Sequence, residues 1–227
     1  MNVLDLLPIV LLGAFLGMDV VTFPQAMISR PIVAATFAGA FIGNAPAGLI
    51  MGAILELLAL EMLPFGASRY PEWGSASVVG GALYASSWGD PAGGLVASLL
   101  GALLTAMVSG SSMVRLRRLN ARRAASLKDK LDSGSVDAVT GLQLFGLTAD
   151  LLRGAVVTFV AMLALKPFTS AILTRWTVDA RLSRAIVVAI VAAVAAGAIW
   201  KIFHSVPRAR LVFVSGLVIG AVLIFVR

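Results

Sequence analysis

Long stretches without a charged residue are the feature that most restricts how this chain can fold. The two longest run from Ile32 to Leu55 and from Pro91 to Val114. At about 20 residues per membrane-crossing helix, each is long enough to span a bilayer. A first apolar stretch covers residues 3–23. Shorter uncharged stretches cover residues 138–149, 154–165, 185–200 and 211–226. This pattern predicts an integral membrane protein with several spans.

The composition agrees with the pattern and excludes other classes of protein. Hydrophobic residues make up 59% of the 227 residues and charged residues only 13%, whereas about 25% of a soluble domain is charged. An ordinary cytosolic enzyme, a disordered tail and a fibrous protein are therefore excluded. The apolar stretches do not alternate as the strands of a membrane barrel do. We expect an all-α fold, a polytopic inner-membrane protein whose residues 1–227 form a single integral membrane domain.

The basic residues are concentrated in one place. The formal net charge is +7, and seven of the 18 Lys and Arg residues lie between two apolar stretches. We therefore predict a basic cytoplasmic loop over residues 113–137, between helical halves at 1–112 and 138–227, because cytoplasmic loops carry excess Lys and Arg. Contact of this loop with anionic lipid or an acidic partner is an alternative, and nucleic-acid binding is not expected. The seven residues are Arg115, Arg117, Arg118, Arg122, Arg123, Lys128 and Lys130.

The first half is predicted to contain interrupted, re-entrant helices. A single helix over residues 31–60 would be about 45 Å long, although the hydrocarbon core measures only about 30 Å. Pro46 follows Asn44 near its middle and removes a helical hydrogen bond, so two shorter helices are expected. A second irregular region, residues 61–75, is rich in Pro, Gly and polar residues. Interrupted segments of this kind point to the binding site of a transporter.

Glu56 is the first candidate site residue. It has three apolar neighbours on each side, and a carboxylate at bilayer depth is costly unless it faces protein or water. One interpretation is that it binds the hydroxyl groups of a sugar. The alternative is a buried ion pair with a nearby arginine, either Arg30 or Arg69.

Further candidates surround the other breaks in the apolar pattern. Gln25 carries both donors and acceptors that suit hydroxyl groups, and Arg30 precedes a proline, which favours a turn. For each of these a capping or turn role is the alternative. Asp19, from the same set around the break at Pro24, is a further candidate with the same alternative. The remaining candidates, in the irregular region, are Ser68 and Glu72.

No residue constellation for covalent or metal chemistry is found in the sequence. The chain has no cysteine and one histidine, which excludes disulfides, thiolate metal sites and multi-histidine clusters. We expect no catalytic residue, no cofactor and no metal. His204 lies in a short basic turn and is interpreted as an interfacial turn residue, with phosphorylation as the alternative.

Several motifs together resemble one known family. Arg30-Pro-Ile-Val is followed by Gly39 and by the run Gly48-Leu-Ile-Met-Gly-Ala-Ile-Leu-Glu-Leu-Leu-Ala-Leu60, then by Gly66-Ala, Pro71-Glu72 and Ala76-Ser. This part of the chain, about residues 10–85, resembles the mannose/sorbose-type IIC subunit of the bacterial sugar phosphotransferase system.

The resemblance implies a function and a set of partners. IIC subunits form the sugar-translocating channel of the inner membrane together with a IID subunit, and separate IIA and IIB proteins carry out phosphoryl transfer. The resemblance therefore implies a hetero-oligomer that is not itself an enzyme, with Glu56 and Pro71-Glu72 in the polar region that faces the sugar. A stand-alone ion-coupled transporter of a small polar solute is the alternative function. A regulatory sensor or scaffold is a third interpretation.

Overall fold

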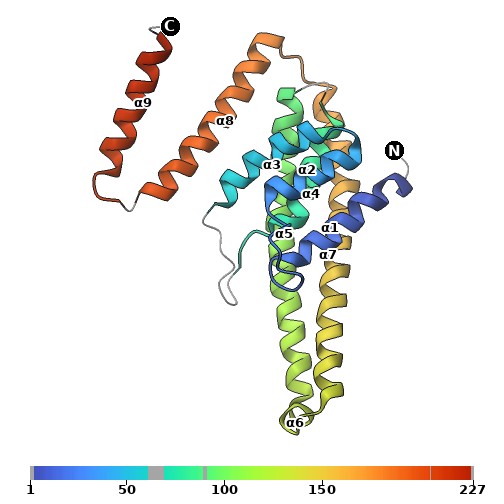
Figure 1. Cartoon of the computed structure of the whole chain (residues 1–227). Coiled ribbons are helices and arrows are strands. Elements are labelled where there is room, and N and C mark those ends of the chain that lie inside the picture. Colours follow the sequence, from blue (N-terminus) through green and yellow to red (C-terminus); the bar gives the residue numbers. More distant parts are fainter. Residues whose placement is uncertain (1–2, 61–68, 89–90, 205, 226–227) are drawn as a thin grey trace.

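Helices make up the regular secondary structure of the chain. The computed structural model describes residues 3–60, 69–88, 91–204 and 206–225, and within these ranges it contains helices and no strand. Figure 1 shows a compact group of short helices beside two long ones, with two further helices at the C-terminal end lying to one side. The all-α prediction is confirmed.

The described helices that precede residue 87 are too short to cross a membrane alone. A 3₁₀ turn, Val3–Leu6, leads into α1 (Leu7–Asp19). Then come α2 (Pro31–Ile42), α3 (Ala45–Ala59) and α4 (Trp73–Ser86). At about 1.5 Å per residue, each of these four helices is shorter than the hydrocarbon core of about 30 Å.

The predicted break near Asn44 is confirmed. Helix α2 ends at Ile42 and is capped by Gly43, whose φ of 91° is left-handed and therefore suits glycine. Asn44 caps the next helix, its side-chain oxygen accepting a bond from the Ala47 amide at 3.1 Å. A Cβ on Gly39 would lie 2.7 Å from the Gly48 Cα. The two antiparallel helices therefore pack backbone against backbone.

Helix α4 forms the centre of the compact region. Every residue from Gly74 to Ala85 is buried, and the helix contacts α1, α2, α3, α5 and α7. Its sequence is dominated by Gly, Ala and Ser, so neighbouring helices approach closely, as is usual where helices associate in membranes.

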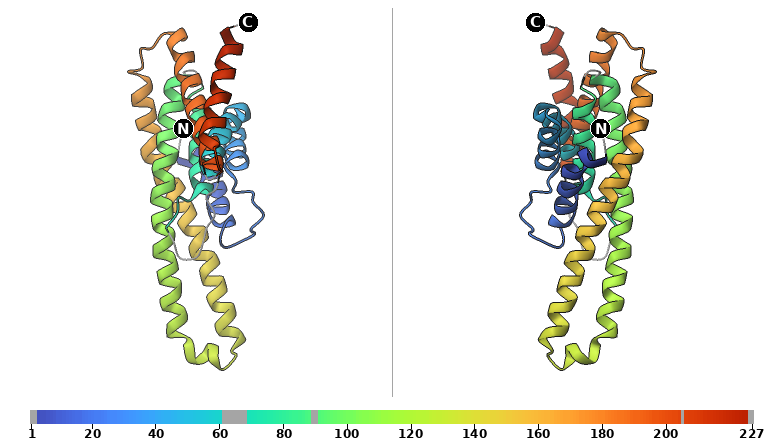
Figure 2. Two further views of the ribbon diagram at one scale, coloured as in Figure 1. Left: turned by 90° about the vertical axis from the view of Figure 1, so that its left-hand side faces the viewer. Right: turned by 90° about the vertical axis from the view of Figure 1, so that its right-hand side faces the viewer.

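The two long helices form an antiparallel hairpin. Helix α5 (Pro91–Ser126) has 36 residues and α7 (Val136–Leu173) has 38, joined through the short α6 (Lys128–Asp132). Figure 2 shows that the α6 end of this hairpin extends well beyond the other helices.

The hairpin contains the segment predicted as a basic cytoplasmic loop, residues 113–137, and its side of the membrane stays a prediction. Most of that segment is helical, because α5 continues to Ser126 and α7 begins at Val136. The reason is that Arg, Leu and Ala are good helix formers, so the basic residues end the apolar stretch without ending the helix. The Arg123 guanidinium also lies 3.9 Å from the centroid of the Phe145 ring on α7.

The second half contains fewer, longer helices than the apolar stretches indicated. Residues 138–149 and 154–165 both belong to α7. Helices α8 (Ala180–Phe203) and α9 (Ala209–Phe225) follow, and Trp200 contacts Phe213 edge to face with ring centroids 5.8 Å apart. Among the described residues, α5, α7 and α8 are long and apolar enough to cross a membrane.

Candidate functional site

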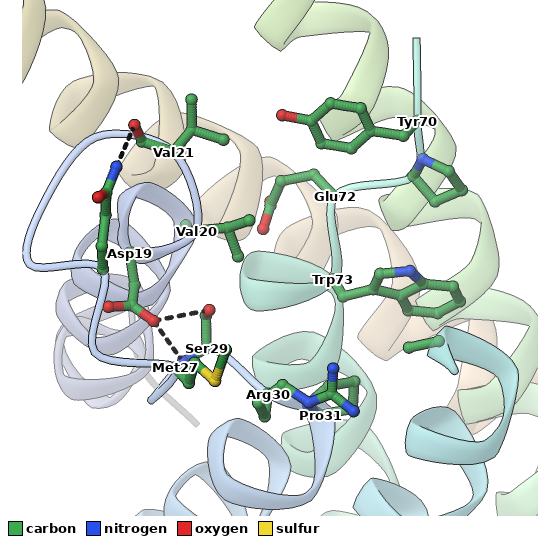
Figure 3. A pocket seen from close by; sticks show the side chains of 14 residues that line it. Asp19, Val20, Val21, Met27, Ser29, Arg30, Pro31, Tyr70, Glu72 and Trp73 are labelled. Atoms are coloured by element: carbon green, nitrogen blue, oxygen red, sulfur yellow. Dashed lines mark hydrogen bonds between the residues drawn. The ribbon is translucent and has the colours of Figure 1, made fainter. Parts of the chain in front are cut away.

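A cavity of about 330 Å³ lies between two non-adjacent segments of the chain, around residues 17–31 and 70–73. One wall comes from the end of α1 and the connection to α2, and the other from residues 70–73 at the start of α4 (Figure 3). Four of the six predicted site residues line it, namely Asp19, Gln25, Arg30 and Glu72. The structure therefore brings together residues that lie up to 53 positions apart in the sequence.

Asp19 organises the first wall. Its side chain is fully buried, and it accepts hydrogen bonds from the Ala26 amide at 2.8 Å and the Ser29 amide at 2.9 Å. The Ser29 hydroxyl donates a third bond of 2.8 Å. Because buried N–H groups need partners, this carboxylate holds the connection between α1 and α2 in place. These contacts agree with the turn role given as the alternative for Asp19.

Gln25 stands on the connection that Asp19 holds. Its φ of 60° is left-handed, as is the φ of 59° at Met27, and non-glycine residues in this region are uncommon and often mark functional segments. Its amide donates to the Val21 carbonyl at 3.0 Å. The side chain is exposed, so it can reach a ligand in the cavity.

Arg30 and Glu56 form an ion pair. The second Glu56 oxygen accepts a 3.2 Å bond from the Ile32 amide, at the positive end of the α2 dipole. Arg30 lines the cavity, whereas Glu56 is not among the lining residues. The structure thus shows the ion pair given as the alternative for Glu56. Its direct contact with a ligand stays a prediction.

Glu72 forms the opposite wall. It caps α4 by accepting bonds from the Ser75 amide, at 3.1 Å to one oxygen and 3.3 Å to the other. The Ser109 hydroxyl donates to it at 2.6 Å. The residue is only 3% exposed, and Figure 3 shows its side chain pointing across the cavity toward Val20. It is a carboxylate held in place beside a ligand-sized space.

The remaining candidates have different positions. Ser68 lies outside the residues that the structure describes. His204 ends α8, where its Nδ1 lies 2.6 Å from the Lys201 carbonyl oxygen, as suits a turn residue.

One buried ion pair near the cavity was not predicted from the sequence. The Arg153 Nε donates to the Asp150 Oδ1 at 2.7 Å, and both side chains are almost completely buried. Both residues lie between the uncharged stretches 138–149 and 154–165. Opposite charges three residues apart between apolar stretches were the available signal, because such pairs face each other on one helix.

A substitution at Glu56 tests the role of its ion pair. Changing Glu56→Gln removes the charge that pairs with Arg30 but keeps the side-chain shape. Because the Arg30 side chain is 40% exposed, water screens the stranded charge, and we expect a loss of about 1–2 kcal/mol rather than the larger cost of a fully buried pair. Thermal unfolding of the purified protein measures this. An unchanged melting temperature together with lost ligand binding would instead favour direct contact.

Comparison with known proteins identifies the family. A family model described as "PTS system sorbose-specific iic component" matches residues 3–182. The fructose permease IIC component of Bacillus subtilis (strain 168) is 32% identical over 79 residues. That match covers 35% of this chain and 29% of the relative, so it spans less than a third of that protein.

Two solved structures share the fold. One, described as "Structure of membrane protein", gives a TM-score of 0.69 at 16% identity. The other, described as "CryoEM Structure of Mannose Transporter ManYZ and Microcin E492 (MceA) complex", gives 0.62 at 18% identity. Each alignment covers 100% of this chain and 95% of the solved chain. Together with the apolar helices, the matches show a multi-pass membrane protein of known fold, and the chain belongs to the family of sorbose-specific IIC components of the sugar phosphotransferase system.

Proposed function

We propose that this chain is the sugar-translocating IIC subunit of a mannose/sorbose-type phosphotransferase system in a bacterial inner membrane. It binds a hexose-like sugar in the cavity between the α1–α2 connection and residues 70–73, and passes it to soluble subunits for phosphorylation. The IID subunit is its membrane partner, and the IIB and IIA subunits transfer the phosphoryl group. The family match supports this proposal, and the cavity with its convergent polar side chains carries it.

The chemistry of the cavity wall suits a polyhydroxylated ligand. Glu72 supplies a carboxylate that accepts hydrogen bonds from hydroxyl groups, while Arg30 and Gln25 supply donors. The space of about 330 Å³ falls within the usual range of small-molecule sites, about 300–1,000 Å³. Asp19 contributes indirectly, because it shapes the connection on which Gln25 stands.

The proposal is tested by uptake in cells that lack other hexose uptake systems. The chain is expressed with its IID, IIB and IIA subunits, and accumulation of radiolabelled fructose, mannose and sorbose is measured. We expect the labelled sugar to be recovered as its phosphate, and uptake to continue when a protonophore collapses the ion gradient. Accumulation of free sugar that the protonophore abolishes would contradict the proposal and favour the ion-coupled transporter. Absence of uptake for all three sugars would contradict a hexose-like substrate.

The orientation of the long hairpin follows from the same proposal. The chain has no cysteine, so single cysteines report cleanly. We expect Ser126→Cys, at the end of α5 among the basic residues, to react with a membrane-impermeant maleimide only after the cells are opened. Thr174→Cys, at the opposite end of α7, is the matched position and is expected to react in intact cells. The reverse pattern would place the basic hairpin outside the cell.

A further inference from the structure

The buried ion pair on α7 lies behind the cavity wall and has no role in the function described so far. Asp150 and Arg153 have side-chain exposures of 1% and 7%. Removing two charges from water costs several kcal/mol per ion unless further hydrogen bonds compensate. The partners of this pair therefore show what it holds in place.

The Arg153 guanidinium reaches three helices through three different nitrogens. Its Nε binds Asp150 on the same helix. Its Nη1 donates to the Ser109 hydroxyl on α5 at 2.8 Å, and its Nη2 donates to the Gly17 carbonyl of α1 at 2.8 Å. That carbonyl lies in the last turn of α1, where a cation is favoured. Only arginine presents donors in such a rigid fork.

Ser109 carries the connection to the cavity. Its oxygen accepts the bond from Arg153, and its hydroxyl donates to the Glu72 Oε2 at 2.6 Å. The donors therefore point in one direction, from the guanidinium through the hydroxyl to the carboxylate. This chain of bonds ends on the wall formed by Glu72.

Asp150 connects the same ion pair to the other wall. Its Oδ2 accepts a hydrogen bond from the Thr22 hydroxyl, which lies on the connection between α1 and α2. Gly17, bound by Arg153, also lines the cavity. Hydrogen bonds therefore connect both walls of the cavity to the Asp150–Arg153 ion pair on α7.

We propose that Arg153 is a positioning residue for the sugar site. It sets the Glu72 carboxylate through Ser109 and the end of α1 through Gly17, and Asp150 orients it and anchors the connection through Thr22. The proposal rests on the proposed function for the identity of the ligand. The position of Glu72 can be measured without any ligand.

The first experiment measures the charge that faces the cavity. Val20→Cys places a thiol on the wall toward which Glu72 points (Figure 3). In purified protein, the rate of its modification by a cationic methanethiosulfonate is divided by the rate for an anionic one. A nearby negative charge raises this ratio. We expect this ratio to fall at least about threefold when Ser109→Ala or Arg153→Lys is added, because Glu72 is no longer held toward the thiol.

A matched variant and a transport measurement complete the test. Ser111→Ala removes an exposed hydroxyl of the same helix, one that donates to the Met107 carbonyl, and is expected to leave the ratio unchanged. In the chain without the added cysteine, we expect Ser109→Ala to raise the KM for the transported hexose about tenfold, with little change in Vmax per folded protein.

The outcomes separate this proposal from the proposed function. An unchanged thiol ratio with an unchanged KM in Ser109→Ala overturns the positioning role, even if Arg153→Lys fails to fold. A lower Vmax at constant KM also overturns it, because that result shows only a structural role. A changed ratio in a chain that transports none of the three hexoses supports the positioning of Glu72 and contradicts the proposed function.

Discussion

Replacing Asp19 with alanine is expected to detach the connection between α1 and α2 and to abolish transport. The change leaves the buried amide and hydroxyl of Ser29, and the exposed Ala26 amide, without the carboxylate that accepts their hydrogen bonds. Unsatisfied buried donors cost about 1–3 kcal/mol each, so we expect a loss of about 3 kcal/mol, measured by thermal unfolding in detergent. Because this connection carries Gln25 and Arg30, uptake is expected to fall to background.

A second aspartate provides the matched control for that substitution. Asp179 also accepts two backbone amide bonds, from Arg181 and Leu182 at the start of α8, but it is exposed. Asp179→Ala is expected to cost only about 1 kcal/mol, as is usual for an exposed helix cap. Equal losses of stability in the two variants would mean that the buried position of Asp19 has no special importance.

Adding a single methyl group at Gly81 is expected to disrupt the centre of the protein. A Cβ there would lie 2.5 Å from the Ala35 carbonyl oxygen and 2.7 Å from the Ala35 Cα. Both are backbone atoms, so no side-chain rotation can relieve the contact, and α4 must move away from α2. We expect Gly81→Ala to destabilise the protein by about 3 kcal/mol, measured as a lower melting temperature and a lower yield of folded protein.

The same change on an open helix face is the control for Gly81. A Cβ on Gly197, in α8, meets nothing within 4 Å. Because alanine favours helix over glycine by about 1 kcal/mol, Gly197→Ala is expected to be neutral or slightly stabilising. If both variants lost stability equally, close packing between α2 and α4 would not explain the effect at Gly81.

Local chemistry explains which parts of the fold could be predicted from the sequence. The break at Gly43 and Asn44 follows from the backbone preferences of glycine, asparagine and proline, and these act within a few residues. The bend before Pro31 has the same origin, and Arg30 has the extended ψ of 135° expected there. Glu56 was recognised as unusual because a charge within an apolar stretch is costly.

The errors arose where distant contacts decide the structure. Arg153 is buried because Gly17 and Ser109, 136 and 44 residues away, supply its partners, and no local pattern contains that information. The sequence left Arg30 and Arg69 as possible ion-pair partners of Glu56. Only the packing of α2 on α3 shows that the partner is Arg30. The basic end of α5 was taken for a loop because charge was used to place boundaries. Charge limits burial in lipid, whereas helix formation depends on the backbone.

The antiparallel pairing of α2 and α3 has a consequence for how the chain is threaded through the bilayer. Arg30, before α2, and Ala59, at the end of α3, line the same cavity, so the chain returns to the level from which it started. We therefore expect the pair to count as zero crossings of the membrane, however apolar its residues are. The side of the membrane that each later helix reaches then depends on whether the number of the other membrane crossings before it is odd or even. We expect the insertion machinery to accept α2 and α3 only together, since either helix alone would leave its end inside the lipid.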